Sequence, residues 1–172
     1  MIAKKEIKHQ LTVFDIQYSL YMQNERHIVL KNSYIFCKTF RRYESDFAYI
    51  TKAGYSHEIE IKRTYKDFLA DFKKYGKHED LKKGTCKQNY FSFCFFNKEL
   101  ADRCLPEIPK KYGVCYFGNS TINWIKAPDL LIKKTMDWRQ IALRMAETYK
   151  TNVFMNELKR RQSCITCISK KH

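Results

Sequence analysis

The chain has 172 residues, of which 44% are hydrophobic and 30% charged, so that its composition suits one globular domain and excludes wholesale disorder. Only 5 glycines and 3 prolines occur, which excludes collagen-like and flexible low-complexity chains. The chain has 33 lysines and arginines but only 18 acidic residues, which gives a formal net charge of +15. A charge this positive predicts a polyanionic partner, with nucleic acid as the first candidate and an anionic membrane surface as the second.

The cysteine count and the N-terminus indicate the compartment. Seven cysteines occur, an odd number, and the first residues are charged with no apolar signal segment, so we expect free thiols rather than a disulfide framework. The longest strongly apolar run, residues 90–96, is far shorter than the ~20 residues that cross a membrane. We therefore expect a soluble cytoplasmic protein that makes no use of a membrane.

The first half of the chain predicts one helix and three strands, followed by a second helix. Apolar residues spaced three and four apart predict a helix over 11–22. Segments rich in β-branched and aromatic residues predict strands over 27–38, 44–51 and 56–63, and the last two flank a turn at 52–55 in which Gly54 can adopt positive φ. Thr64 and Asp67 resemble a capping box, so a helix is expected from Thr64 to a stop at Gly76.

The second half completes a layered α/β domain. Residues 77–88 predict a basic loop or a short helix, 90–96 a buried strand, 112–117 and 121–125 a hairpin, and 136–159 a long helix. Elements in this order predict one three-layer α/β domain with a central mixed sheet over residues 1–160. The basic segment 161–172 is expected to be a flexible tail.

The strand at 56–63 carries the residues that suggest chemistry. By alternation, Ile59 and Ile61 face one side of the sheet, while Glu58, Glu60 and Lys62 face the other. Asp46 of the preceding strand joins the charged side whether it pairs opposite Glu60, with the loop centred near Ala53, or opposite Lys62, with the loop centred on Gly54. Both registers predict two or three carboxylates beside one ammonium group. The alternative is that these charges form only the solvent face of an antiparallel strand.

Such a cluster suits the hydrolysis of phosphodiesters. Asp46 and Glu60 would be hard oxygen ligands for Mg²⁺ or Mn²⁺, and the ion would lower the pKa of a bound water and offset charge that grows on the phosphoryl oxygens. Lys62 would contact the scissile phosphate or orient the attacking water. These three residues are therefore the expected catalytic set.

The pattern Asp46…Glu60-Ile61-Lys62 resembles the PD-(D/E)xK nuclease superfamily, in which an acid is followed after a variable gap by acid-x-Lys on the next strand. Residues 58–74 are similar to the strand–helix signature of its MmcB-like, DNA-repair-associated branch and of phage and bacterial relatives. With the segments 89–96 and 108–117, the resemblance covers roughly residues 12–127. The chain departs from the pattern in having Ser45, not proline, before Asp46.

The resemblance implies a restriction-endonuclease-like core, dependence on Mg²⁺ or Mn²⁺, and hydrolysis of DNA in repair or in the processing of phage and mobile DNA. By this resemblance, the polar face of the helix after the motif consists of Asp67, Asp71 and Lys73. We expect these residues and Glu58 to surround the metal ligands Asp46 and Glu60. On the alternative interpretation, Asp67 caps the helix and Asp71 pairs with Lys74 or with a lysine from another element. Glu58 and Lys73 would then be solvated.

Basic residues after the motif predict a DNA-binding rim, although their alternative role is solubility. The expected phosphate contacts are Lys74, Lys77, Lys82, Lys83 and Lys87. His57 and His78 are expected to be solvated, with His57 on the side opposite the acids.

Together the residues predict a magnesium-dependent nuclease that acts on DNA, with RNA as a second possible substrate. The alternative is a catalytically silent nucleic-acid-binding module, or an interaction subunit, of the same fold. The presence of all three core residues favours the enzyme.

Overall fold

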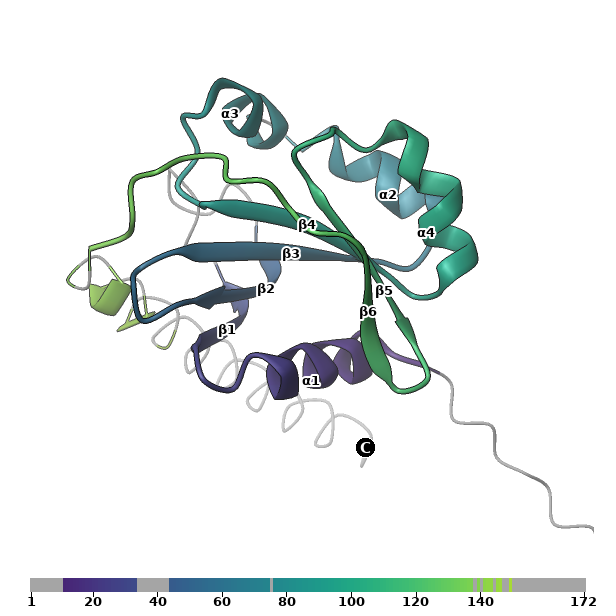
Figure 1. Cartoon of the computed structure of the whole chain (residues 1–172), viewed down its shortest axis with the longest axis horizontal. Coiled ribbons are helices and arrows are strands. Elements are labelled where there is room, and N and C mark those ends of the chain that lie inside the picture. The colour runs from purple at the N-terminus through teal and green to yellow at the C-terminus, as the bar shows by residue number, and fades with distance from the viewer. Residues whose placement is uncertain are drawn as a thin grey trace, which may run out of the picture.

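The computed structural model describes residues 11–33, 44–74 and 76–137, together with seven positions between 139 and 149. These residues form an α/β domain in which a six-stranded mixed sheet lies between α1 on one side and α2, α3 and α4 on the other (Figure 1). The predicted three-layer α/β architecture is confirmed at this level. The predicted tail at 161–172 lies outside the described residues.

The elements follow one another in the order helix, three strands, two helices, strand, helix and hairpin. Their bounds are α1 Val13–Gln23, β1 Ile28–Ser33, β2 Ser45–Ile50, β3 Ser56–Lys62, α2 Tyr65–Asp71, α3 Lys77–Lys83, β4 Tyr90–Phe95, α4 Lys98–Cys104, the 3₁₀ turn η1 Leu105–Glu107, β5 Gly113–Gly118 and β6 Thr121–Lys126.

The strands lie in the sheet in their chain order, β1 to β6. The neighbours β3–β4 and β4–β5 are parallel, and the other three pairs are antiparallel. In the β2–β3 hairpin, Phe47 pairs with Ile59 and Ala48 with Glu58. The next pair along this register sets Asp46 opposite Glu60, which is the first of the two registers expected from the sequence.

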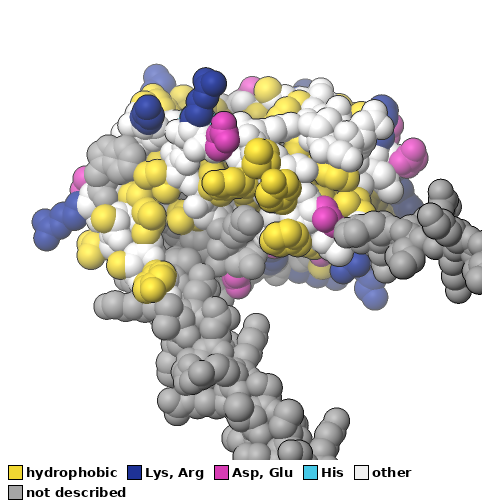
Figure 2. All heavy atoms as spheres, turned by 90° about the horizontal axis from the view of Figure 1, so that it is seen from below, with side chains coloured by type: hydrophobic (Ala, Val, Ile, Leu, Met, Phe, Trp, Pro, Cys, Tyr) yellow, Lys and Arg dark blue, Asp and Glu magenta, His cyan; other side chains and the backbone are white. Residues whose placement is uncertain are grey.

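The two faces of the sheet bury different cores. On the α1 side, Ile16 and Leu20 of the helix pack against Phe47, Ile59 and Ile61. Figure 2 looks onto this side of the molecule, where exposed hydrophobic side chains gather. They include Phe14, Tyr18 and Met22 of α1.

The opposite side is an aromatic core under α2 and α4, built on Phe91, Phe93 and Phe95 of β4. Because these three phenylalanines pair with Glu58, Glu60 and Lys62 in the parallel register, the charged side chains of β3 share their face. All seven residues of β3 are buried. The alternative of a solvated strand face is therefore wrong, because helices cover the side of the sheet that carries the acids.

The helix after β3 begins where the sequence predicts and ends earlier. The Thr64 side chain accepts a hydrogen bond from the backbone N–H of Asp67, which caps α2. The helix ends at Asp71 instead of continuing to Gly76. Gly76 has a φ of 70° and allows the sharp turn from which α3 begins. This early turn returns Lys74 and Lys77 to the sheet, which a continuous helix would carry away from it.

Two further segments bear on the predictions from the sequence. Helix α4 was not predicted; Asn97 caps it by accepting a hydrogen bond from the backbone N–H of Leu100. The long helix expected over 136–159 lies largely outside the described residues, and the described positions between 139 and 149 are helical. Among the described residues, we find no helix with the length and apolar character needed to cross a membrane.

A buried cluster of carboxylates and lysines

The predicted strand motif lies within a larger network of charged side chains under α2 and α3. Three carboxylates from β3 and α2 face three lysines and one histidine. We call this network the acid–lysine cluster; its members are Glu58, Glu60, Lys62, Asp71, Lys74, Lys77 and His78.

Glu60 is at the centre of the cluster. Its Oε2 lies 3.1 Å from Lys62 Nζ and 2.9 Å from Lys74 Nζ, and its Oε1 lies 2.7 Å from Lys77 Nζ. Burial acts to raise the pKa of this carboxyl group, but the lysine ammonium groups outweigh it and bring the pKa below its ordinary value. Glu60 is therefore ionised, and lysines compensate its charge.

Asp71 connects the motif strand to the helix that follows it. Its Oδ1 lies 2.8 Å from Lys62 Nζ and 2.6 Å from Lys74 Nζ, and its Oδ2 accepts a hydrogen bond from His78 Nε2 at 2.8 Å. Burial would raise the pKa of Asp71, but the hydrogen bond from His78 and the nearby lysines hold it far below its ordinary value. Asp71 therefore pairs both with Lys74 and with Lys62 of β3, which confirms the alternative in which it pairs with Lys74 or with a lysine from another element.

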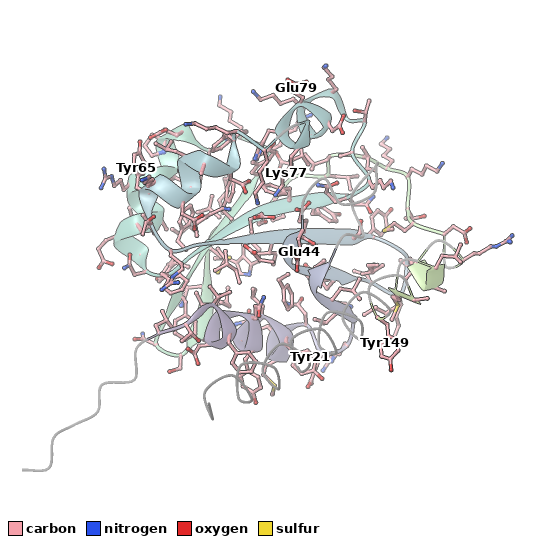
Figure 3. All side chains as sticks on the ribbon, turned by 180° about the vertical axis from the view of Figure 1, so that it is seen from behind. Tyr21, Glu44, Tyr65, Lys77, Glu79 and Tyr149 are labelled. Carbon is pink, nitrogen blue, oxygen red and sulfur yellow. The ribbon has the colours of Figure 1, made fainter. Side chains whose placement is uncertain are left out.

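Lys77 is fully buried between α3 and the sheet, whereas Glu79 of the same helix points outward (Figure 3). Its Nζ lies 3.1 Å from Glu58 Oε1 and 4.8 Å from the centre of the Phe91 ring. Burial acts to lower the pKa of Lys77, but Glu58, Glu60 and Asp71 raise it well above its ordinary value. The side chain is therefore a charged structural member of the cluster, and the prediction that it contacts DNA phosphates at the surface is wrong.

Glu58 is the third buried acid of the cluster. It is fully buried, and Gln88 donates a hydrogen bond to its Oε2. Burial raises the pKa of Glu58 to about 8, although Lys77 acts in the opposite direction. Glu58 is thus neither a solvated charge at the start of the strand nor an exposed ligand.

Asp46 lies at the edge of the cluster. Its Oδ2 accepts a hydrogen bond from the backbone N–H of Ile61 at 2.8 Å, which fixes the carboxylate beside the motif. Burial and then the charge of Glu60 raise its pKa to about 6. Asp46, Glu60 and Lys62 therefore lie together on one side of the hairpin, as the alternation predicts.

The other predicted residues lie outside the cluster. Asp67 is exposed at the start of α2, where it accepts a hydrogen bond from the backbone N–H of Arg63. Lys73 is exposed, and neither Asp67 nor Lys73 contacts Asp46 or Glu60. Of the predicted DNA-binding lysines, Lys82 and Lys83 are exposed on α3 and Lys87 is half-buried. Lys74 belongs to the cluster, with 34% of its side chain exposed.

The sequence also mispredicted both histidines and missed two polar partners. His78 is buried, stacks on Phe72 and lies 3.1 Å from the hydroxyl of Tyr112. His57 is buried on the α1 side of the sheet, so that its predicted face is right and its predicted solvation is wrong. Gln88 and Tyr112 were missed because their roles depend on contacts between distant segments.

Asp46 and Glu60 are the residues that could hold a magnesium ion. Mg²⁺ in proteins commonly takes one or two carboxylates and completes its coordination with water and phosphate, and Asp46 and Glu60 are such a pair. Within the described part of the chain, no three His, Cys, Asp or Glu side chains are grouped to hold a metal ion. Glu60 is paired with lysines, so an ion would compete with Lys74, its most exposed partner.

Comparisons with known proteins support the fold alone. No family model matches the chain, and no curated protein matches it. The chain is similar in structure to the SPO1766 protein of unknown function from Silicibacter pomeroyi, with a TM-score of 0.54 and 12% sequence identity over 84% of this chain and 86% of that one. This likeness extends over most of both chains and adds nothing about chemistry.

Proposed function

We propose that the chain is a metal-dependent nuclease of the PD-(D/E)xK type that hydrolyses phosphodiester bonds of DNA. The observation that supports this most directly is the position of Asp46 and Glu60 on one side of the β2–β3 hairpin, with Lys62 Nζ 3.1 Å from Glu60 Oε2. The mixed α/β sheet with helices on both sides is compatible with a restriction-endonuclease-like core.

Each of the three residues has a role that suits its position. Asp46 keeps one carboxylate oxygen on the Ile61 N–H, which orients the group, and its pKa of about 6 leaves it ionised at neutral pH. Asp46 and Glu60 would hold Mg²⁺, which would supply charge neutralisation at the phosphate and acidify a water. Lys62 is held between Glu60 and Asp71 with only 3% of its side chain exposed, so it would act on the phosphate or the water only after Glu60 exchanges partners.

The exposed lysines suit the proposed substrate. Lys82 and Lys83 are exposed in the last turn of α3, whose first turn carries Lys77 and His78 of the cluster, and the whole chain carries a net charge of +15. Lysines in this position can neutralise backbone phosphates without reading sequence. DNA repair, or the processing of phage and mobile DNA, is the context that the resemblance suggests for this activity.

One observation favours a second candidate, a catalytically silent DNA-binding module. Both oxygens of Glu60 already lie within 3.1 Å of a lysine ammonium, so the carboxylate has full charge compensation without a metal. In a silent module this network would be a permanent structural feature. In the nuclease it would be a resting arrangement that a metal and a substrate rearrange.

A metal exchange separates the two candidates. Labelled single-stranded, duplex and branched DNA and single-stranded RNA are incubated with the protein in Mg²⁺, Mn²⁺, Ca²⁺ or EDTA. Cleavage is read on gels and binding by anisotropy. The nuclease cuts in Mg²⁺ or Mn²⁺ and binds without cutting in Ca²⁺. Binding that ignores the metal, with no cleavage of any substrate, supports the silent module instead.

A further inference from the structure

A cavity of about 420 Å³ lies on the α1 side of the sheet, opposite the acid–lysine cluster. Helix α1 ends at Gln23, beside this cavity. The cavity is lined by Tyr49 of β2, His57 of β3, Tyr90 of β4 and Trp124 of β6, and by Gln23 and Asn24 at the end of α1. Its volume falls in the range of small-molecule sites, ~300–1,000 Å³.

Aromatic rings form half of the lining. The His57 ring lies 5.0 Å from that of Tyr49 and 5.9 Å from those of Tyr90 and Trp124, between ring centres. Trp124 is 43% exposed, a large fraction for an indole on a strand. Aromatic groups at these spacings offer faces on which a further planar ring can stack.

The wall is held rigid by a chain of hydrogen bonds. The Tyr49 hydroxyl lies 2.7 Å from His57 Nδ1, and His57 Nε2 lies 2.8 Å from Ser92 Oγ. A Cβ on Gly113 would lie only 2.2 Å from the Ser92 Oγ, so the absence of a side chain at Gly113 leaves room for this hydroxyl. Burial lowers the pKa of His57 to about 3, so the imidazole is neutral at physiological pH. The rings of Tyr49 and His57 are thus positioned before any ligand arrives.

The end of α1 adds amide groups to this aromatic wall. Gln23 Nε2 donates to the Thr121 hydroxyl at 2.9 Å, and Asn24 Nδ2 donates to the Leu20 carbonyl at 2.8 Å. These bonds fix both side chains at the cavity. Each amide also carries an oxygen that can accept a hydrogen bond from a ligand.

We propose that this cavity binds a nucleobase, with the base stacked on Trp124 and its polar edge toward the amides of Gln23 and Asn24. Stacking on aromatic side chains is the general way in which proteins hold unpaired bases. The net charge of +15 would attract the phosphate attached to such a base. The base can belong to a single strand or to a free nucleotide. The inference does not depend on cleavage at the acid–lysine cluster.

Trp124 itself can report binding. In a Trp138→Phe protein, Trp124 is the sole tryptophan of the chain, which has two. Its fluorescence is titrated in EDTA with single-stranded oligonucleotides, with free dAMP and dTMP, and with a blunt duplex. We expect saturable quenching by the single strand, by the free nucleotides or by both, and none by the duplex, whose bases are already stacked. A single strand that quenches alone identifies a strand-binding site, and equal quenching by free nucleotides identifies a nucleotide site.

Two variants and one matched control test the location. Trp124→Ala should weaken binding of the quenching ligand, measured by anisotropy or calorimetry, by about tenfold or more, the loss of one stacked base. Phe14→Ala removes another exposed aromatic side chain, on α1 and outside the cavity, and should leave affinity unchanged. Ala127→Leu adds bulk to the cavity lining without removing a core group, and should also weaken binding.

The result that overturns the proposal is equally direct. If no strand or nucleotide quenches the fluorescence of Trp124, the cavity does not hold a base. The same conclusion follows if the Ala127→Leu and Phe14→Ala proteins bind the quenching ligand with equal affinity. Melting temperatures show that each variant is folded, and the exposed position of Ala127 makes that variant usable if Trp124→Ala unfolds. Because EDTA prevents cleavage, this outcome is separate from the outcome for the proposed nuclease.

Discussion

Lys62 Nζ lies 2.8 Å from Asp71 Oδ1, which joins the lysine of the acid-x-Lys strand to the helix that follows it. The same ammonium group lies 3.1 Å from Glu60. Asp71 thus sets the position of a proposed catalytic lysine without being one of the predicted metal ligands. The strand motif and the α2–α3 turn therefore form one electrostatic unit.

Removing the buried ammonium of Lys77 should strongly destabilise the fold. In Lys77→Met, the buried Glu58, Glu60 and Asp71 lose a cation that they share. We expect a loss of about 3–5 kcal/mol in the free energy of unfolding, the usual result of breaking a buried ion pair from one side. Urea denaturation measures it. Lys83→Met, on the exposed end of the same helix, should change stability by no more than about 0.5 kcal/mol, and equal losses in both variants would contradict the buried role.

The stability of the protein should depend on pH through Glu58. Its pKa is raised by burial from 4.5 to about 8, so between these values the folded state holds a proton that the unfolded state releases. The contribution of Glu58 to the free energy of unfolding therefore falls as the pH rises from 4.5 to 8. Above pH 8 this contribution no longer changes with pH. Glu58→Gln removes this term, so its stability relative to the wild type should increase from pH 5 to pH 8.5. A difference that stays constant over this range would show that Glu58 is ionised throughout.

The exposed lysines of α3 should control the salt dependence of DNA binding. Lys82→Gln with Lys83→Gln should weaken binding to all sequences alike and reduce the slope of log affinity against log salt by up to about 0.9 for each lost phosphate contact. Lys98→Gln on α4, whose lysine pairs with Asp102, is the matched control and should leave the slope unchanged. If the double variant keeps the wild-type slope, these lysines serve solubility alone.

The sequence predicts the shared face of Asp46, Glu60 and Lys62 because strand alternation is local. It does not predict the depth of that face, since burial depends on α2 and α3 folding back over β3. Charged residues at alternate positions look the same in a solvated strand and in a compensated interior. The compensating lysine at position 77 becomes visible only once the chain turns at Gly76, which the sequence suggested as a simple helix stop.

Long-range packing also explains why the sequence mispredicted the burial of the two histidines. His57 and His78 are polar residues beside charged ones, so local composition suggests solvent exposure. In the fold each lies among aromatic rings, and each hydrogen-bonds to partners from other elements, which in both cases include a tyrosine hydroxyl. Helix α4 was missed for a different reason, because its cap at Asn97 follows directly on an aromatic strand.

The most direct test of the proposed nuclease is cleavage by Glu60→Gln in Mg²⁺ beside the charge-matched surface variant Glu79→Gln, whose side chain is 76% exposed. Glu60→Gln removes one of two proposed ligands and should lower the cleavage rate at least about 100-fold, a loss in the range of electrostatic catalytic groups. Its affinity for DNA should be equal or higher, because Lys62 and Lys74 lose an anionic partner. Glu79→Gln should cut like the wild type. Full Mg²⁺-dependent cutting by Glu60→Gln would contradict the site.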